Sequence, residues 1–204
     1  MSLSASNRKT KVGLFFGSFN PIHVGHLVIA NAMLENTDMG EVWFVVSPHN
    51  PLKERTTLLA DHHRLQMVKI AIDDNYGFRA CDEEFILPKP SYTVITLTHL
   101  SEKYPNKEFA LIMGADNLCS FHKWRNYEYI MSNYKIYVYP RPKSGMENTE
   151  LENLPSKGIE MINAPMMDIS SSYIRNAIKE GKSIKYIVSE PVLRYIEEMN
   201  FYKK

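Results

Sequence analysis

Residues 17–26, with the sequence GSFNPIHVGH, gather the residue types that could handle a phosphate. They follow an apolar run that predicts a strand, and they open a stretch of helical period. A turn before a helix is an anion site, because unpaired helix N–H groups and the helix dipole point at it. His23 and His26 are three residues apart, so both imidazoles lie on one face and can address one anion. Ser18 adds a hydroxyl donor.

Two glycines give this segment its shape. Gly17 would let the backbone approach a phosphate, and Gly25 removes a side chain where a base or ribose could pack. The Walker pattern GxxxxGK[ST] and the GxGxxG fingerprint are both absent here, which excludes those two phosphate-binding solutions. Histidines can also simply satisfy local polar groups. A pair that flanks a glycine at a strand-to-helix turn favours the functional interpretation.

A second segment, ISSSYIR at residues 169–175, combines hydroxyls at a helix start with an arginine one turn later. Ser170 and Ser172 with Arg175 could hold a polyphosphate by charge-assisted hydrogen bonds. Alone the segment is a weak signal, because serine caps are common and Arg175 could be a surface charge. It gains weight if it meets the first segment at one edge of a sheet.

Composition bounds the class of protein. The 204 residues carry 24 basic and 23 acidic side chains, a net charge of +1, which argues against binding nucleic acid through an overall basic field. Cys81 and Cys119 have no metal-ligand or disulfide-framework spacing, so we expect two reduced thiols. Apolar runs are far shorter than the roughly 20 residues of a membrane helix. We therefore expect a cytoplasmic protein that uses no membrane and no nucleic acid.

Short β-branched runs alternate with helical stretches, which is the pattern of a parallel sheet with crossover helices. Asp61, Ser170 and Ser189 are predicted helix N-caps, with Pro191 in the first turn of the last helix. The helix after Ser170 is expected to stop at Gly181, and residues 140–157 are expected to form a loop. We predict strands at 12–16, 41–47, 78–81, 108–113, 135–139 and 159–163, and helices at 24–36, after 61 and at 92–104.

The predicted fold class is α/β, a three-layer α/β/α Rossmann-like open parallel sheet with flanking helices. We expect one domain over residues 11–204, with residues 1–10 disordered or derived from a tag. In such sheets ligands bind at the carboxyl ends of strands, where the strand order reverses. Both candidate segments directly follow predicted strands.

Together the segments resemble the (T/H)xGH and ISxTxxR signatures of the nucleotidyltransferase superfamily. Within it, residues 12–200 resemble the bacterial nicotinate-nucleotide adenylyltransferases. Three further segments are similar to motifs of that family: SPHNPLK at 47–53, SYTVITL at 91–97, and MGAD at 113–116 followed by Trp124. The resemblance implies adenylyl transfer from ATP to nicotinate mononucleotide, giving nicotinate adenine dinucleotide and pyrophosphate on the route to NAD, without a covalent enzyme intermediate.

The resemblance also implies residue roles on the ATP side. His23 and His26 would donate hydrogen bonds to the ATP phosphates, while Ser172 and Arg175 would hold the leaving pyrophosphate. Mg²⁺ would arrive with the ATP, because no dedicated carboxylate cage for it is evident. The remaining residues expected to line the ATP site are Gly17, Ser18, Phe19, Gly114, Asp116, Ile169 and Ser170.

For the nicotinate nucleotide, Trp124 offers a flat face on which the ring can stack. The resemblance implies that backbone amides near Thr93 and Trp124, beside Tyr92, take the pyridine carboxylate. Lys53, Arg141 and His49 are the candidates for the phosphate and ribose. Ordinary half-buried packing for Trp124, and solvated loop charges for Lys53 and Arg141, are the alternatives.

The chain departs from the family pattern at three places. Phe16 and Asn20 stand where the family commonly has the first Gly and the Asp of Gly-Gly-(T/S)-Phe-Asp-Pro. Asn20 can still cap and hydrogen-bond the turn, although a negative charge is lost. Leu52 stands where the proline-rich loop of the family usually carries His.

Several alternatives stay open from the sequence. Phosphopantetheine adenylyltransferase shares fold and chemistry but would not need Trp124 or the SYTVITL segment. A cytidylyltransferase or an enzyme that prefers nicotinamide mononucleotide comes next. HVGH also resembles the HIGH signature of class I aminoacyl-tRNA synthetases, which would need a longer chain with a basic domain. A non-catalytic nucleotide-binding protein is the last alternative, and a homo-oligomer is compatible with all of them.

Overall fold

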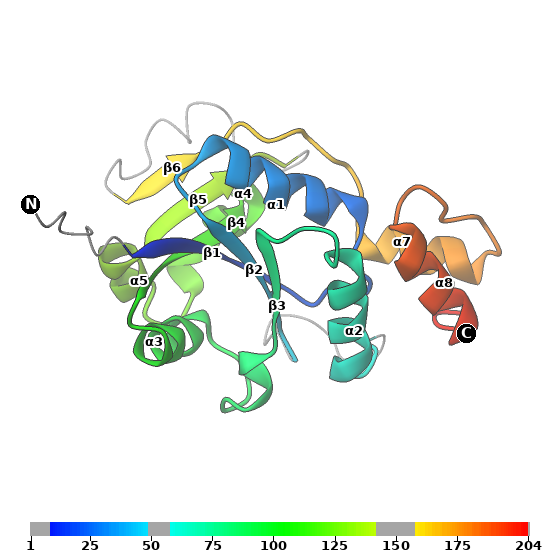
Figure 1. The fold of residues 1–204 in the computed structure, drawn as a ribbon, viewed down its shortest axis with the longest axis horizontal. Coiled ribbons are helices and arrows are strands. Elements are labelled where there is room, and N and C mark those ends of the chain that lie inside the picture. The colour runs from blue at the N-terminus through cyan, green and yellow to red at the C-terminus, as the bar shows by residue number, and fades with distance from the viewer. Residues whose placement is uncertain (1–8, 49–57, 142–157, 204) are drawn as a thin grey trace, which may run out of the picture.

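The computed structural model describes residues 9–48, 58–141 and 158–203. Its centre is a six-stranded, fully parallel sheet in the order β3-β2-β1-β4-β5-β6 (Figure 1). The strand order reverses between β1 and β4, so the carboxyl ends of these two strands form the switch point where ligands bind in such sheets. The strands are β1 (Thr10–Gly17), β2 (Glu41–Val46), β3 (Phe78–Cys81), β4 (Lys107–Gly114), β5 (Lys135–Tyr139) and β6 (Ile159–Met161).

Helices cover both faces, which confirms the predicted three-layer α/β/α architecture. They are α1 (Val24–Asn36), α2 (Asp61–Ala71), α3 (Thr93–Lys103), α4 (Ala115–Cys119), α5 (Tyr127–Asn133), α7 (Ser171–Lys179) and α8 (Glu190–Glu198), with 3-10 turns η1 (Glu83–Phe85) and η2 (Phe121–Lys123). The last two helices, α7 and α8, lie together at the end of the molecule away from the described amino-terminal strand (Figure 1).

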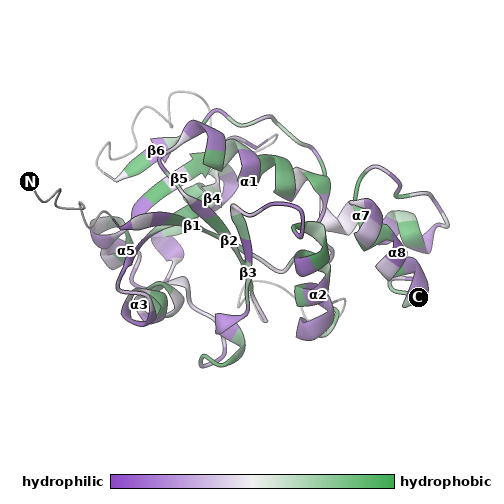
Figure 2. Ribbon diagram, in the orientation of Figure 1, coloured by the Kyte–Doolittle hydropathy of each residue, from purple (hydrophilic) through white to green (hydrophobic). Residues whose placement is uncertain are grey.

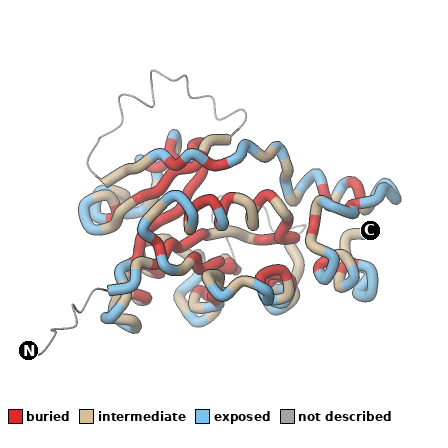
Figure 3. Tube along the Cα trace, turned by 45° about the horizontal axis from the view of Figure 1, so that its top comes forward, coloured by how far each residue is buried: buried red, intermediate tan, exposed pale blue. Residues whose placement is uncertain are grey.

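Alternating strand residues divide the core in two. On β2, Val42 and Phe44 pack with α1, α2, α7 and α8, whereas Trp43 and Val45 pack with α3, α4 and α5. This alternation follows from the period of two of a strand, which sends successive side chains to opposite faces. The central strands β4 and β5 are coloured hydrophobic in Figure 2, and the tube through the central strands is largely buried in Figure 3. The sheet is therefore buried on both faces, as a parallel sheet requires.

The predicted strand and helix boundaries are confirmed within two residues, and two of the predicted helix caps differ from expectation. Asp61 is the first residue of α2 and not its cap, because its carboxylate accepts a hydrogen bond from Arg64. Ser189 occupies the cap position of α8, but its buried hydroxyl has no partner in the described part of the chain. The last strand ends at Met161 rather than at 163. The loop predicted at 140–157 and the segment predicted at 1–10 lie mostly outside the described residues.

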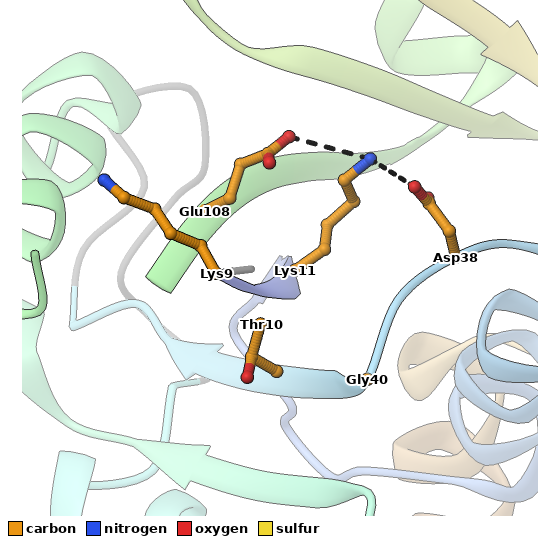
Figure 4. Close-up of a pocket in the computed structure, with 6 residues that line it drawn as sticks. All are labelled: Lys9, Thr10, Lys11, Asp38, Gly40 and Glu108. Carbon is orange, nitrogen blue, oxygen red and sulfur yellow. Dashed lines mark hydrogen bonds and ion pairs between the residues drawn. The ribbon is translucent and has the colours of Figure 1, made fainter. Parts of the chain in front are cut away.

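A polar cavity of about 620 Å³ lies at the opposite edge of the sheet, at the amino ends of β1 and β4 (Figure 4). Lys11 points into it and is paired with Asp38 at 2.6 Å and with Glu108 at 3.6 Å. Its charge is thus already compensated within the protein. We assign no ligand to this cavity, and the functional residues gather at the other edge.

Candidate active site

The loop after β1 owes its shape to Phe19, whose backbone is left-handed with φ of 44°. This turn folds the Phe19 ring back into the core, where it is 1% exposed and packs against Phe15, Phe44 and His26. A Cβ on Gly17 would stand 2.8 Å from the Phe19 ring, so position 17 must be glycine. The Phe19 side chain is therefore part of the core, and the loop can offer only its backbone at this position.

His23 and His26 lie stacked at the start of α1, with ring centroids 3.7 Å apart and planes at 24°. The backbone N–H of His23 donates to Nδ1 of His26 at 3.2 Å, which caps the helix. Because that nitrogen accepts, a neutral His26 ring carries its proton on Nε2. The two imidazoles share one face as predicted.

Gly25 has a different neighbour from the one expected. A Cβ there would lie 3.0 Å from Nδ1 of His23 and 3.5 Å from Cβ of Met167. The missing side chain thus makes room for the His23 ring, and the packing of a base or ribose beside Gly25 stays a prediction. His23 is 4% exposed, and its Nδ1 has no partner among the described residues.

Burial, with the nearby positive charge of Arg141 as a second cause, lowers the pKa of His23 from 6.5 to about 4. His23 is therefore neutral at pH 7. Between pH 6.5 and 4 the unfolded chain binds a proton that the folded chain does not, so stability falls as pH falls. We expect this residue alone to reduce the free energy of unfolding by about 3 kcal/mol between pH 7 and pH 4.

Urea unfolding of the wild type and of His23→Gln at pH 7 and pH 4 measures this loss of stability. Between these pH values the free energy of unfolding of the variant should fall by about 3 kcal/mol less than that of the wild type, because glutamine does not titrate. Parallel pH dependences of the two proteins would contradict the assignment. The comparison cancels carboxyl groups such as Asp38, whose pKa, lowered to about 2 mainly by its hydrogen bond with Lys11, is the same in both proteins.

Helix α7 is hydrogen-bonded directly to the loop between β1 and α1. These contacts confirm that the segments 17–26 and 169–175 meet at one edge of the sheet. The hydroxyl of Ser170 caps the helix by accepting from the N–H of Tyr173 at 3.1 Å. Ser171 donates to the carbonyl of Pro21 at 2.9 Å. Arg175 donates to the carbonyl of Asn20 at 2.9 Å and to the hydroxyl of Ser172 at 3.1 Å. Ile169 packs against the core just before the helix.

Asn20 is a buried junction at the departure from the family pattern. Its Oδ1 accepts from the Leu59 N–H at 3.3 Å and from the Tyr202 hydroxyl at 2.8 Å. Both partners lie far from the turn in the sequence, and the cap position of α1 belongs to His23, so the prediction that Asn20 caps the turn is wrong and its hydrogen bonding to the turn stays a prediction. The chain after α8 thus hydrogen-bonds the loop between β1 and α1 through Tyr202, a role that goes beyond packing.

A third group follows β4 and β5. Asp116, in the first turn of α4, accepts from Arg141 at 3.4 Å. A Cβ on Gly114 would collide with the Asp116 carboxylate and would stand 3.2 Å from the Tyr139 ring. Arg141 also lies close enough to His23 for its positive charge to lower the pKa of that ring. Its assignment to the nicotinate nucleotide stays a prediction.

Tyr92 and Thr93 form the start of α3, and Trp124 follows η2. The guanidinium of Arg125 lies 4.8 Å from the Tyr92 ring centroid, so the two segments are neighbours. The Trp124 amide already donates to the carbonyl of Phe121 at 2.9 Å. Trp124 therefore offers its half-buried ring, and the free amides of this region belong with the amino end of α3. His49 and Lys53 lie outside the described residues.

Sequence reasoning missed three residues that hold the site: Arg64, Ser171 and Tyr202. Arg64 had a detectable signal, because it lies four residues before Val68 and thus on the predicted apolar face of α2. Ser171 was one of three adjacent serines with nothing to separate it from the others. Tyr202 had no signal, because its contact spans 182 residues.

Comparison with known proteins identifies the family. The cytidylyltransferase-like family matches residues 14–177. A probable nicotinate-nucleotide adenylyltransferase of Flavobacterium johnsoniae is 58% identical over 194 residues, which are 95% of this chain and 100% of that protein. The chain belongs to the nicotinate-nucleotide adenylyltransferase family. A family member from Bacteroides fragilis is 45% identical over 92% of both chains.

Solved structures of the family share the fold. The nicotinic acid mononucleotide adenylyltransferase of Plasmodium falciparum, complexed with APC, superposes with a TM-score of 0.77 at 22% identity and covers 95% of this chain and 97% of its own. A putative family member from Vibrio parahaemolyticus gives a TM-score of 0.70 at 20% identity, over 96% of each chain. The resemblance inferred from the HVGH and ISSSYIR segments is confirmed.

Two features are absent from residues 9–48, 58–141 and 158–203. None of the helices there combines the length and the apolar character that crossing a membrane would need. Groups of three or more His, Cys, Asp or Glu side chains placed to hold a metal ion do not occur within the same ranges. Cys81 and Cys119 are both free thiols, and burial raises the pKa of Cys81 to about 11.

Proposed function

We propose that this protein transfers the adenylyl group of ATP to nicotinate mononucleotide, releasing pyrophosphate and forming nicotinate adenine dinucleotide. The observation that carries the proposal is the hydrogen bond from Arg175 to the Asn20 carbonyl. It joins Arg175 of α7 to the loop that precedes His23 and His26. One chain of phosphates can therefore contact the arginine and the histidines together. Family membership at 58% identity to a probable enzyme of this name supports the choice of reaction.

In the reaction, a 5′-phosphate oxygen of nicotinate mononucleotide attacks the α-phosphorus of ATP. The new P–O bond forms as the bond from the α-phosphorus to the bridging oxygen breaks, and that electron pair leaves with pyrophosphate. The protein has little covalent chemistry to do, so its residues position the substrates and stabilise developing charge. This supports direct in-line transfer without a covalent enzyme intermediate.

We assign the donors as follows. The Nε2–H of His26 and the ring of neutral His23 are assigned to the ATP phosphates, because the His26 ring packs against Phe19 of the loop after β1 and the His23 ring stacks on it. Arg175, with Ser172, takes the leaving pyrophosphate. Gly17, Ser18, Phe19, Gly114, Asp116, Ile169 and Ser170 line the rest of the ATP site, and Mg²⁺ enters bound to the ATP phosphates rather than to a carboxylate cage.

For the second substrate, we place the pyridine ring on Trp124 and its carboxylate at the amino end of α3, by Tyr92 and Thr93. Helix amide groups and the helix dipole favour an anion there, which would select the acid over the neutral amide. We assign Arg141, whose charge acts on His23, to the phosphate and ribose of this nucleotide. His49 and Lys53 are assigned to the same groups by the family resemblance alone. We place the reaction in the cytoplasm, where free thiols such as Cys81 and Cys119 persist.

The test is a pyrophosphate-release assay with ATP, Mg²⁺ and one acceptor in each reaction. We expect release with nicotinate mononucleotide to exceed that with nicotinamide mononucleotide and with phosphopantetheine. Faster release with phosphopantetheine would favour the sister adenylyltransferase. ATP binding without release in any reaction would indicate a non-catalytic nucleotide-binding protein.

A further inference from the structure

Arg64 of α2 is the most completely buried cation that the structure describes, with a relative exposure of 0%. Its guanidinium makes four hydrogen bonds. Nη1 donates to the carbonyls of Ser18 at 2.6 Å and Ser47 at 2.9 Å. Nε donates to the Leu59 carbonyl at 3.0 Å, and Nη2 donates to the Asp61 carboxylate at 2.6 Å.

The Ser18 and Ser47 carbonyls belong to chain segments that bind different substrates in the proposed function. Ser18 follows β1 in the loop between β1 and α1, which is assigned to the ATP phosphates. Ser47 follows β2 at the start of the 47–53 segment, which the family resemblance assigns to the nicotinate nucleotide. A single guanidinium thus joins the two loops at the point where both leave the sheet. The planar fork of arginine can hold several carbonyls at once, which the ammonium of lysine cannot do in the same geometry.

Stability alone does not explain a charge at this place. Burying a guanidinium costs several kcal/mol, and burial indeed lowers the pKa of Arg64. Its carboxylate partner Asp61 is 32% exposed and so returns only part of that cost. Well-packed apolar side chains often replace buried ion pairs without loss of stability. The contacts to the loop carbonyls are what an apolar residue could not supply.

The contact with Ser18 fixes the direction of a peptide group. The Ser18–Phe19 peptide is trans, so its carbonyl and its N–H point in opposite directions. With the carbonyl held towards Arg64 inside the protein, the Phe19 N–H points away from Arg64. That N–H has no hydrogen-bond partner in residues 9–48, 58–141 and 158–203. The left-handed Phe19 backbone, at φ of 44°, needs such outside support to persist.

We propose that Arg64 is a positioning residue, which aims the Phe19 amide at the bound ATP and locks the two substrate loops together. It acts through the Ser18 and Ser47 carbonyls and does not touch substrate. The inference rests on the proposed function, because it takes the loop after β1 as the ATP site. According to this proposal, Arg64 contributes to the affinity for ATP although it is buried and does not touch the substrate.

The first test compares Arg64→Lys with Met67→Ala, a buried position of the same helix whose apolar side chain cannot donate a hydrogen bond to the loop carbonyls. Both variants should lower the melting temperature. Calorimetric titration with Mg·ATP should show about tenfold weaker binding for Arg64→Lys and a change of less than twofold for Met67→Ala. Unchanged ATP affinity in Arg64→Lys, or an equal loss in Met67→Ala, would overturn the proposal.

The second test uses the wild-type protein and stays informative if Arg64→Lys does not fold. In ¹H–¹⁵N spectra, Mg·ATP should shift the Phe19 amide proton downfield, while the Gly40 amide at the opposite sheet edge stays in place. An unchanged Phe19 signal would mean that the Phe19 N–H does not bind ATP. Arg64 would then have no donor to position, and the proposal would be overturned. Both tests measure ATP binding alone. Failure of the proposed function would show instead as ATP binding without pyrophosphate release.

Discussion

His26→Ala should lower kcat for pyrophosphate release by a factor of about 100 to 1000, the usual cost of removing one preorganised donor from a site of developing charge. The His26 Nδ1 accepts from the His23 N–H at 3.2 Å, and its Nε2–H is the donor that we assign to the ATP phosphates and that alanine removes. Loss of the same cap should cost only about 1 kcal/mol of stability. Steady-state assays at saturating substrates and urea unfolding measure the two effects separately.

Two controls make this result specific. His62→Ala removes an exposed histidine of α2, and its kcat should equal that of the wild type. His26→Asn retains a side-chain acceptor for the His23 N–H, so it should recover stability without recovering rate. A His26→Ala variant with more than a third of the wild-type kcat would remove His26 from its assigned role.

Arg175→Ala should lower kcat/KM for ATP by a factor of about 100 to 1000, because charge-assisted contacts to the leaving pyrophosphate disappear. The variant also loses the hydrogen bonds from the guanidinium to the Asn20 carbonyl and to Ser172. Arg175→Lys retains the charge but not the fork, so an intermediate loss of about tenfold is expected. Initial rates of pyrophosphate release over a range of ATP concentrations give these values.

The matched control is Arg194→Ala on α8, which removes an exposed arginine that pairs with Glu190 at 3.2 Å. A surface ion pair of this kind contributes at most about 1 kcal/mol, so its kcat/KM should not change. If Arg175→Ala stayed within threefold of the wild type, α7 would not hold the pyrophosphate. The proposed assignment of that helix would then be wrong.

Local features of the chain were predictable from the sequence because they depend on near neighbours. The β-branched runs predicted all six described strands to within two residues, since strand formation follows the local pattern of apolar residues. The cap at Ser170 was also predictable, because a cap bonds an amide three residues away. The Asp61 cap was wrong because Arg64, one turn later in the same helix, takes its carboxylate.

Contacts between distant residues were not predictable from one sequence. Tyr202 reaches Asn20 across 182 residues, and Arg64 reaches Ser18 across 46. Nothing in the local sequence of either partner encodes the other. The environment of His23 is of the same kind, because its lowered pKa depends on burial and on Arg141, which stands beyond the end of β5.

The sequence by itself determined the family, the parallel α/β architecture and the segments that carry the chemistry, because HVGH and ISSSYIR are short motifs with local spacing. Only the tertiary structure decided how those segments are held. The strand order brings the ends of β1 and β4 side by side, and the fold then places α7, α2 and the chain after α8 around one loop. The physical reason is that hydrogen bonds and burial act through space, and their partners exist only once the chain has folded.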